Sequence, residues 1–369
     1  MSASKNVFAT LSGIIVVGTI IGVLAALLQK LGNPANMGIC VACFERDIAG
    51  ALGLHRAAVV QYLRPEIPAF VLGSFLAALL FREFKPRGGS APISRFFLGM
   101  VAMIGALVFL GCPWRAVLRL AGGDANALFG IAGLAAGVYG GTLFFRQGYS
   151  LGRSTSQSMS TGLMLPLIML GLLALRFLFP PIPETAQSGV LFYSLKGPGA
   201  AYAPVAAALL IGLAVGFLAQ RSRFCTMGAL RDVILFRHFH LMYGVLALLV
   251  AAWLANLTFG QFNPGFESQP VAHTQWFWNF AGMTVAGLAF ALAGGCPGRQ
   301  LFMAGEGDGD AGIFVLGMIS GAAVAHNFGM ASSPAGIGAY GMAAVIIGLT
   351  VCLVIGFGNI QKAIVRASI

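Results

Sequence analysis

Long apolar stretches separated by short polar segments run through this sequence from end to end. A helix needs roughly 20 apolar residues to cross about 30 Å of hydrocarbon, and ten stretches approach that length. The pattern therefore predicts an all-α polytopic membrane protein. The stretches lie at residues 8–29, 57–81, 95–111, 127–147, 158–179, 202–220, 233–258, 274–295, 311–330 and 337–358.

Composition and charge favour the same class. Only 9% of the 369 residues are charged and 58% are hydrophobic, whereas soluble domains carry about 25% charged residues. The net charge of +11 comes mostly from cations between apolar stretches, where they set topology and contact lipid headgroups. We therefore expect the lipid bilayer as a partner and no nucleic acid. The first apolar stretch lacks a cleavage site followed by a polar segment, so we expect a retained helix and not a signal peptide.

Two halves of the chain repeat the same landmarks. A cysteine followed by Arg-Asp recurs after 185 positions, and a Gly-Cys-Pro-x-Arg motif followed by an aspartate recurs after 184. We expect the halves to be residues 1–185 and 186–369. The landmarks are Cys40, Arg46, Asp47, Cys112 and Asp124 in the first half, and Cys225, Arg231, Asp232, Cys296 and Asp308 in the second.

Each half holds about five predicted spans, and this odd number has a topological consequence. The second half must enter the membrane in the opposite sense, which predicts an inverted repeat of the kind that many transporters use. Lys and Arg are more numerous on the side that carries the first residues. The positive-inside rule therefore predicts that both termini are cytoplasmic.

The Gly-Cys-Pro-x-Arg motif ends an apolar stretch in each half. Proline is favoured at the first position of a helix, so the motif predicts a short broken or re-entrant helix with the cysteine at its N-cap. The unpaired N–H groups and the positive dipole end of such a helix attract anions, and the motif arginine adds positive charge. The residues are Cys112, Pro113 and Arg115 in the first half, and Cys296, Pro297 and Arg299 in the second.

The other repeated cysteines, Cys40 and Cys225, each follow an apolar stretch. Residues 33–38, just before Cys40, are typical of broken backbone, which at membrane depth is tolerated only beside protein or a water-filled cavity. We therefore expect both cysteines on a solute path. The Arg-Asp pairs that follow them are either structural ion pairs or supporting parts of the site.

Two further cysteines fall outside the repeated design. Cys43 forms a Cys-x-x-Cys sequence with Cys40, but Gly228 takes the matching position in the second half. A structural zinc site would need four ligands, and no further set accompanies it. We expect Cys43 to be a packing residue, as is Cys352 in the middle of an apolar stretch.

The sequence carries none of the common catalytic motifs. It has no phosphate-binding loop, Ser-His-Asp set or paired catalytic carboxylates, so we expect a protein that is not an enzyme and needs neither cofactor nor metal. We expect Asp124 and Asp308 to cap helices or to pair with the motif arginines.

The repeated motifs resemble those of a known family. Residues 37–47, 111–115 and 295–299 are similar to the YeeE/YedE family of sulfur-transport proteins, and within it to the YedE-type proteins assigned to selenium transport. The resemblance covers nearly the whole chain. It implies uptake of a solute such as thiosulfate through a narrow, hourglass-shaped path lined by cysteines.

By that resemblance Cys40, Cys112 and Cys296 are the conducting thiols. Cys225 fills the fourth symmetric position, which thiosulfate transporters often lack. A thiol is polarizable, uncharged at neutral pH and a weak donor, and transport needs sites weak enough to release their solute. These thiols therefore suit a soft sulfur or selenium compound.

Two functions remain from the sequence. The first is a permease in a bacterial inner membrane for a small sulfur- or selenium-containing solute, which a cytosolic thiol carrier protein could receive. The alternative is a membrane thiol oxidoreductase that moves reducing equivalents across the bilayer. Disulfide exchange needs cysteines with Cα atoms usually 4.4–6.8 Å apart, and only the Cys-x-x-Cys at Cys40 and Cys43 is an obvious local pair.

Overall fold

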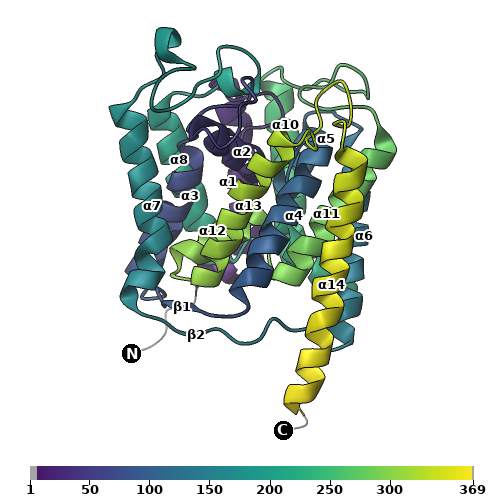
Figure 1. Ribbon diagram of the computed structural model, residues 1–369. Coiled ribbons are helices and arrows are strands. Elements are labelled where there is room, and N and C mark those ends of the chain that lie inside the picture. Colours follow the sequence, from purple (N-terminus) through teal and green to yellow (C-terminus); the bar gives the residue numbers. More distant parts are fainter. Residues whose placement is uncertain (1–5, 368–369) are drawn as a thin grey trace.

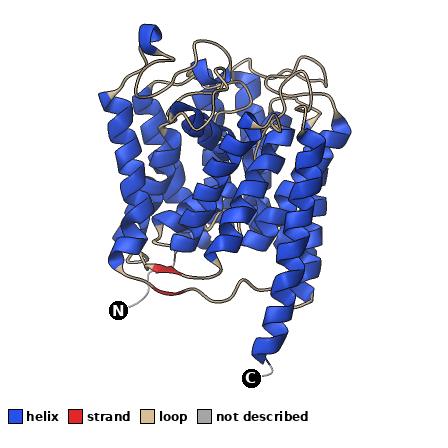
Figure 2. Ribbon diagram, viewed as in Figure 1, coloured by secondary structure: helices blue, strands red, loops and turns tan. Residues whose placement is uncertain are grey.

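The computed structural model describes residues 6–367, and side chains as far as Ile360. This part of the chain is almost entirely helical, with a single two-stranded ribbon at one end of the bundle (Figure 2). The ribbon joins β1 (Arg87–Gly88) to β2 (Thr155–Ser156), and three short 3-10 helices are η1 (Val7–Ala9), η2 (Pro183–Thr185) and η3 (Pro198–Ala200).

The α-helices fall into two series of seven, one in each half of the chain (Figure 1). The first comprises α1 (Leu11–Lys30), α2 (Val41–Ala51), α3 (Glu66–Leu80), α4 (Pro92–Phe109), α5 (Pro113–Ala121), α6 (Ala127–Arg146) and α7 (Met159–Leu178). The second comprises α8 (Val205–Ser222), α9 (Thr226–Phe236), α10 (His240–Thr258), α11 (Trp276–Ala293), α12 (Pro297–Gly305), α13 (Gly309–Asn327) and α14 (Gly341–Ala367).

Within the described residues, nine helical segments are long and apolar enough to cross a membrane. In that count each of the pairs α4–α5, α8–α9 and α11–α12 forms one segment. The tenth stretch, predicted at residues 57–81, is shorter: α3 begins only at Glu66, because Pro65 ends the preceding loop. The prediction of an all-α polytopic membrane protein is confirmed.

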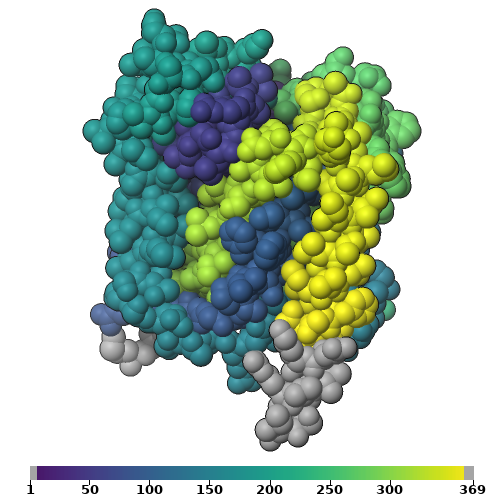
Figure 3. Space-filling view, in the orientation of Figure 1, coloured from purple at the N-terminus to yellow at the C-terminus, as the bar shows by residue number. Residues whose placement is uncertain are grey.

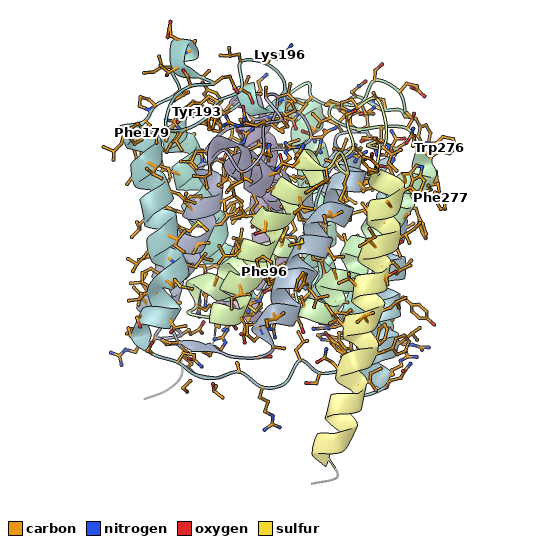
Figure 4. All side chains as sticks on the ribbon, in the orientation of Figure 1. Phe96, Phe179, Tyr193, Lys196, Trp276 and Phe277 are labelled. Carbon is orange, nitrogen blue, oxygen red and sulfur yellow. The ribbon has the colours of Figure 1, made fainter. Side chains whose placement is uncertain are left out.

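The outer surface of the bundle is apolar, as a lipid-facing surface must be. Leu210, Phe277 and Val354 each leave about two thirds of their surface uncovered. Aromatic residues gather near the end of the bundle where α7 ends and α11 begins, including Phe179 and Trp276 (Figure 4). Such aromatic belts mark the interface between membrane and water.

The two series match helix by helix. Helix α9 begins 185 positions after α2, and α11 and α12 begin 184 positions after α4 and α5. The packing of helices repeats as well. The contact between α1 and α10 corresponds to that between α8 and α3, and the contact between α4 and α13 corresponds to that between α11 and α6. The last helices differ: α7 packs on α3, whereas α14 packs on α4 and α11. On one face, α4 therefore lies between α13 and α14 (Figure 3).

The two series run in opposite senses. The backbone amide of Lys85, just before α4, donates to the carbonyl of Glu306, at the end of α12 (2.9 Å). The amide of Ala125, after α5, donates to Gly265 in the loop before α11 (3.0 Å). Helix pair α4–α5 therefore rises from the end of the bundle with the β ribbon, and α11–α12 descends toward it (Figure 1). We call these ends the strand end and the loop end; the arrangement confirms the inverted repeat.

Small residues allow the central helices to approach closely. A Cβ atom added to Gly105 on α4 would lie 2.6 Å from the carbonyl oxygen of Gly282 on α11. Glycines let membrane helices pack by direct backbone contact. This contact holds α4 and α11, which carry the two Gly-Cys-Pro-x-Arg motifs, against each other.

Candidate functional site: paired thiols at helix starts

All four repeated cysteines occupy N-cap positions. Cys112 and Cys296 precede α5 and α12, each with proline as the first helical residue, as predicted. Cys40 and Cys225 are the N-caps of α2 and α9, two short helices whose starts the sequence reading did not locate. Four helix N-termini therefore direct N–H groups and positive dipole ends toward thiols.

The first-half cysteines form a pair. The Sγ atoms of Cys40 and Cys112 are 3.8 Å apart, and the amide of Cys43 donates to Cys40 Sγ at 3.4 Å. Both thiols are buried, with at most 1% of their residue surface exposed. This pairing was not expected, because the sequence suggested only Cys40 and Cys43 as close partners.

The second-half cysteines form an equivalent pair. Cys225 Sγ accepts hydrogen bonds from the amide of Gly228 at 3.2 Å and from the amide of Cys296 at 3.5 Å. Contact between Cys225 and Cys296 therefore repeats that between Cys40 and Cys112. Each half of the protein contributes one buried thiol pair.

The pairs lie at different depths of the bundle. Helices α5 and α12 each have nine residues, which gives them a length of about 14 Å. Because α5 leaves toward the loop end and α12 toward the strand end, Cys112 lies nearer the loop end and Cys296 nearer the strand end. A solute that crossed the bundle along both pairs would meet one after the other.

A cluster of buried aromatic rings joins the two pairs. The ring of Trp114, two residues after Cys112, lies 5.5 Å from that of Phe224, which directly precedes Cys225. Phe302 on α12 and Phe70 on α3 complete the cluster, with ring centroids 5.9 and 6.5 Å from Trp114. We call these four residues the aromatic cluster. All four are at most 1% exposed, so the cluster lies in the interior of the bundle, close in sequence to Cys112 and Cys225.

Sequence reasoning missed this cluster, although one signal was present. Trp114 and Gly298 take the same variable position in the two motifs. In the fold they meet, because a Cβ atom on Gly298 would lie 3.1 Å from the Trp114 indole. The glycine of one repeat makes room for the tryptophan of the other. The indole Nε1 of Trp114 is buried and has no hydrogen-bond partner among the described residues.

The motif arginine of the first half carries an uncompensated charge. Arg115 is fully buried and donates to the carbonyls of Asn36, Leu110, Pro270 and Val271. Its Nη1 also lies 3.7 Å from Cys43 Sγ, and no carboxylate of the described residues forms an ion pair with it. The guanidinium therefore adds positive potential beside the first thiol pair.

The motif arginine of the second half is neutralised instead. Arg299 forms an ion pair with Glu306 (3.2 Å), which also binds Arg223 at 2.6 Å and Arg87 at 3.4 Å. These contacts tie α8, α12 and the segment before α4 together at the strand end. The two motif arginines therefore occupy unlike electrostatic surroundings, despite their equivalent positions in the repeat.

Glu83 adds a second bridge between the halves at the strand end. Its carboxylate accepts from Gln220 (2.8 Å) and Arg223 (3.1 Å) and forms an ion pair with Arg221 (2.8 Å). Burial favours the neutral acid, but the Gln220 hydrogen bond and the two guanidinium charges outweigh it, so the pKa of Glu83 is lowered. The bridge is present at neutral pH and is lost only as the pH falls through this lowered pKa.

The two Arg-Asp pairs do form ion pairs, with different burial. Arg46 and Arg64 both bind Asp47, at 2.7 and 2.8 Å, and all three side chains are at most 2% exposed. Arg231 and Asp232 lie 2.8 Å apart, but the Arg231 side chain is 34% exposed. The first pair belongs to a buried network with Arg64. The sequence did not predict this third member, because Arg64 lies outside the repeated motif.

The two repeated aspartates do not bind the motif arginines. Asp124 pairs with Arg119 at 2.6 Å, and Asp308 pairs with Arg87 at 2.8 Å. Asp308 also caps α13 by accepting from the amide of Ala311. Of the two alternatives expected for these aspartates, capping is seen at Asp308, and in the described residues neither carboxylate pairs with a motif arginine.

The remaining cysteines differ in their surroundings. Cys352 is fully buried within α14, away from the repeated motifs. Cys43 is also fully buried, but it contacts both Arg115 and the backbone beside Cys112, with its Sγ 4.0 Å from the carbonyl oxygen of Leu110. Cys43 is therefore a direct neighbour of the first thiol pair.

Two comparisons bear on the identity of the chain. The profile of a family described as "Sulphur transport" matches residues 221–356, a segment that contains Cys225 and Cys296. The Thiosulfate transporter TsuA of Escherichia coli (strain K12) is 30% identical over 107 residues, which are 29% of this chain and 30% of that protein. The chain thus matches less than a third of this relative's length.

These matches agree with the motifs. The segment matched by the profile includes the second Gly-Cys-Pro-x-Arg sequence and the second thiol pair. The first half repeats both features in the same order along the chain but with the opposite orientation across the bundle. Over residues 221–356 the chain is therefore similar to the sulphur-transport family, in agreement with the resemblance of its motifs to the YeeE/YedE proteins.

Proposed function

We propose that the protein is a permease that passes a small sulfur- or selenium-containing anion between its two buried thiol pairs. The observation that carries this proposal is the placement of all four repeated cysteines at helix N-caps. Helix N-termini attract anions, and thiols offer weak, polarizable contacts to soft atoms. The function is transport and not catalysis.

The charge distribution supports an anionic solute. Arg115 is a buried cation without a carboxylate partner among the described residues, and a negative charge beside it would offset the cost of burying it. A solute that binds there gains attraction from the guanidinium and from the start of α5. Thiols in place of further arginines keep the binding weak enough for release.

The aromatic cluster supplies the barrier between the pairs. Trp114, Phe224 and Phe302 pack against one another next to Cys112 and Cys225 in the chain, and the four thiols are buried. Conduction therefore requires the halves to part at these rings. The inverted repeat is suited to such alternation, because each half can rock against the other around a central site.

The orientation follows from the cations. The strand end, where α1 begins and α14 ends, carries Arg82, Lys85, Arg87, Arg153 and Arg223 on or near its loops. The positive-inside rule assigns this end to the cytoplasm. The protein is then a bacterial inner-membrane permease in which α1 begins and α14 ends on the cytoplasmic side.

Thiosulfate and a selenium oxyanion are the two solutes we propose. The first is supported by the name of the Escherichia coli relative, and the second by the fourth cysteine, Cys225. The solute would leave toward the cytoplasm, where a thiol carrier protein could accept it.

A thiol oxidoreductase is the second candidate, and one observation favours it. The 3.8 Å between Cys40 Sγ and Cys112 Sγ would allow a disulfide after a small movement. This alternative predicts that reducing equivalents cross the membrane in the absence of any transported anion.

The proposal is tested by uptake into proteoliposomes. Purified protein is reconstituted, and the initial uptake of thiosulfate, selenite, sulfite and sulfate is measured beside protein-free liposomes. We expect thiosulfate or selenite to enter at least about tenfold faster than sulfate, which offers no exposed soft atom. Uptake of all four anions at the rate of the protein-free liposomes would reject the permease.

A further inference from the structure

Glu45 is a buried acid that the proposed path does not explain. It lies on α2, five residues after Cys40, and none of its surface is exposed. Both carboxylate oxygens lack a hydrogen-bond partner in the described part of the chain. A buried carboxylate without a partner is costly, so burial here favours the neutral, protonated acid.

In the described part of the chain, no charged group around α2 forms a hydrogen bond or ion pair with Glu45. Helix α2 packs against α3, α4, α12 and α13, and none of their ionisable side chains binds Glu45. Glu66 accepts from Asn33, Arg299 pairs with Glu306, and the His326 ring lies 4.5 Å from the His55 ring. The ionisable groups on these helices and on α2 itself are Cys43, Arg46, Asp47, Glu66, Arg95, Arg299, Asp310 and His326.

The repeat shows that this position does not need an acid for packing. Its counterpart 185 positions later is Leu230. Leu230 lines an apolar cavity of about 180 Å³ with Pro113, Val117 and Ile131. An apolar side chain therefore suffices at this position of the fold. A carboxyl group there costs folding free energy, and no hydrogen bond among the described residues compensates for it.

Accumulation of an anion inside the cell needs an energy source. Each negative charge that enters against an inside-negative potential opposes accumulation, and the sequence has no phosphate-binding loop for ATP. Entry of a proton together with the anion would offset one of its negative charges and add the work of any inward pH gradient. Ionisable groups buried among membrane helices serve as such proton sites.

We propose that Glu45 is a proton-binding site that couples uptake of the anion to entry of a proton, an inference that rests on the proposed permease function. The carboxylate takes up one proton while the path is open to the outside and releases it while the path is open to the inside. No other bond forms or breaks. Because Cys40 caps the same helix, any movement of α2 that admits water to Glu45 also moves the first thiol pair.

The test compares Glu45→Gln with wild type in proteoliposomes under two conditions. Exchange of labelled thiosulfate, and of selenite in parallel, is first measured at equal pH on both sides. Uptake is then measured with the outside one pH unit more acidic and the membrane potential held at zero. A one-unit gradient drives up to about tenfold accumulation for each coupled proton.

We expect wild type to accumulate the anion above equilibrium under the gradient. Glu45→Gln and Glu45→Leu, the second of which copies Leu230, should exchange within about twofold of wild type but show no accumulation. The matched control is Glu66→Gln, a buried acid that differs from Glu45 in that Asn33 holds one of its oxygens; it should keep the accumulation. Size-exclusion profiles in detergent verify that each variant is folded.

The outcomes separate the two proposals. Exchange by wild type without any response to the pH gradient, or gradient-driven accumulation by Glu45→Gln equal to wild type, overturns the role of Glu45 and leaves the permease standing. Absence of exchange of both anions by folded wild type rejects the permease itself, and the coupling with it.

Discussion

At the scale of single residues, the chemistry depends on whether the thiols act as hydrogen-bond donors or as nucleophiles. Cys40 and Cys112 are close enough for either role, with 3.8 Å between their Sγ atoms. As donors they would contact a soft anion weakly. As nucleophiles they would need a thiolate attack and a resolving thiol, and each could resolve the other's adduct.

Serine and alanine substitutions distinguish these roles. If the thiols act as donors, Cys112→Ser should retain more transport than Cys112→Ala, because a hydroxyl still donates a hydrogen bond. We expect about a threefold to tenfold difference in initial uptake at matched protein level. Equal loss in both variants, together with a solute adduct on wild-type Cys112 detected by mass spectrometry, would instead support the thiol oxidoreductase.

In the proposed path Trp114 lies between the two thiol pairs, and its substitution tests this barrier. Trp114→Phe keeps an aromatic ring against Phe224 and Phe302, so uptake and selectivity should stay within about threefold of wild type. Trp114→Ala leaves a cavity opposite Gly298, which costs about 3–5 kcal/mol of stability and should let sulfate enter. The measurement is the ratio of thiosulfate to sulfate uptake; an unchanged ratio in Trp114→Ala would argue against a barrier at this ring.

At the scale of helices, the buried charge network fixes the first thiol pair. Asp47 on α2 binds Arg46 and Arg64, and Arg64 also donates to the carbonyls of Pro198 and Ala201 before α8. The network therefore joins the helix capped by Cys40 to the linker between the halves. In the second half, the equivalent pair of Arg231 and Asp232 is partly exposed.

This contrast predicts unequal losses of stability. Asp47→Asn leaves two buried guanidinium groups without their carboxylate, and removing one partner of a buried ion pair costs about 3–5 kcal/mol. Asp232→Asn breaks a partly exposed pair worth about 0–1 kcal/mol. Thermal unfolding in detergent should show a clearly larger decrease in Tm for Asp47→Asn, and equal decreases would show that the buried network is not what holds α2.

The helix starts differ in how far the sequence predicts them. The starts of α5 and α12 follow from proline after cysteine, because proline is suited to the first turn and breaks the helix before it. Those of α2 and α9 do not, because no proline marks them and the thiol itself caps the helix. The pairing of Cys40 with Cys112 could not be predicted either, since it depends on how α2 packs beside α4.

At the scale of the whole molecule, a repeat at the level of sequence becomes an inversion in the membrane. The constant spacing of the motifs predicts two equivalent halves, and an odd number of spans predicts their opposite sense. What the sequence does not predict is the electrostatic asymmetry of the motif arginines: Arg115 is unpaired by any carboxylate of the described residues, while Arg299 binds Glu306. This difference arises from Glu306, which lies outside the repeated motifs.

The orientation of the halves predicts side-specific labelling. Lys196 is exposed at the loop end (Figure 4), and Arg153 is exposed beside β2 at the strand end. In intact cells a membrane-impermeant maleimide should label Lys196→Cys, whereas Arg153→Cys should react only after permeabilisation, because the cationic strand end faces the cytoplasm. The reverse pattern would invert the proposed topology.

Uptake by cysteine-to-alanine variants tests the central claim, that the solute passes along the thiol pairs, most directly. Initial thiosulfate and selenite uptake is measured for Cys40→Ala, Cys112→Ala, Cys296→Ala and Cys352→Ala at matched levels of folded protein in proteoliposomes. Cys352 is as fully buried as the others but belongs to neither pair, so it controls for the loss of a buried thiol. We expect the first three variants to lose at least about tenfold in rate and Cys352→Ala to stay near wild type; equal losses in all four would contradict a thiol-lined path.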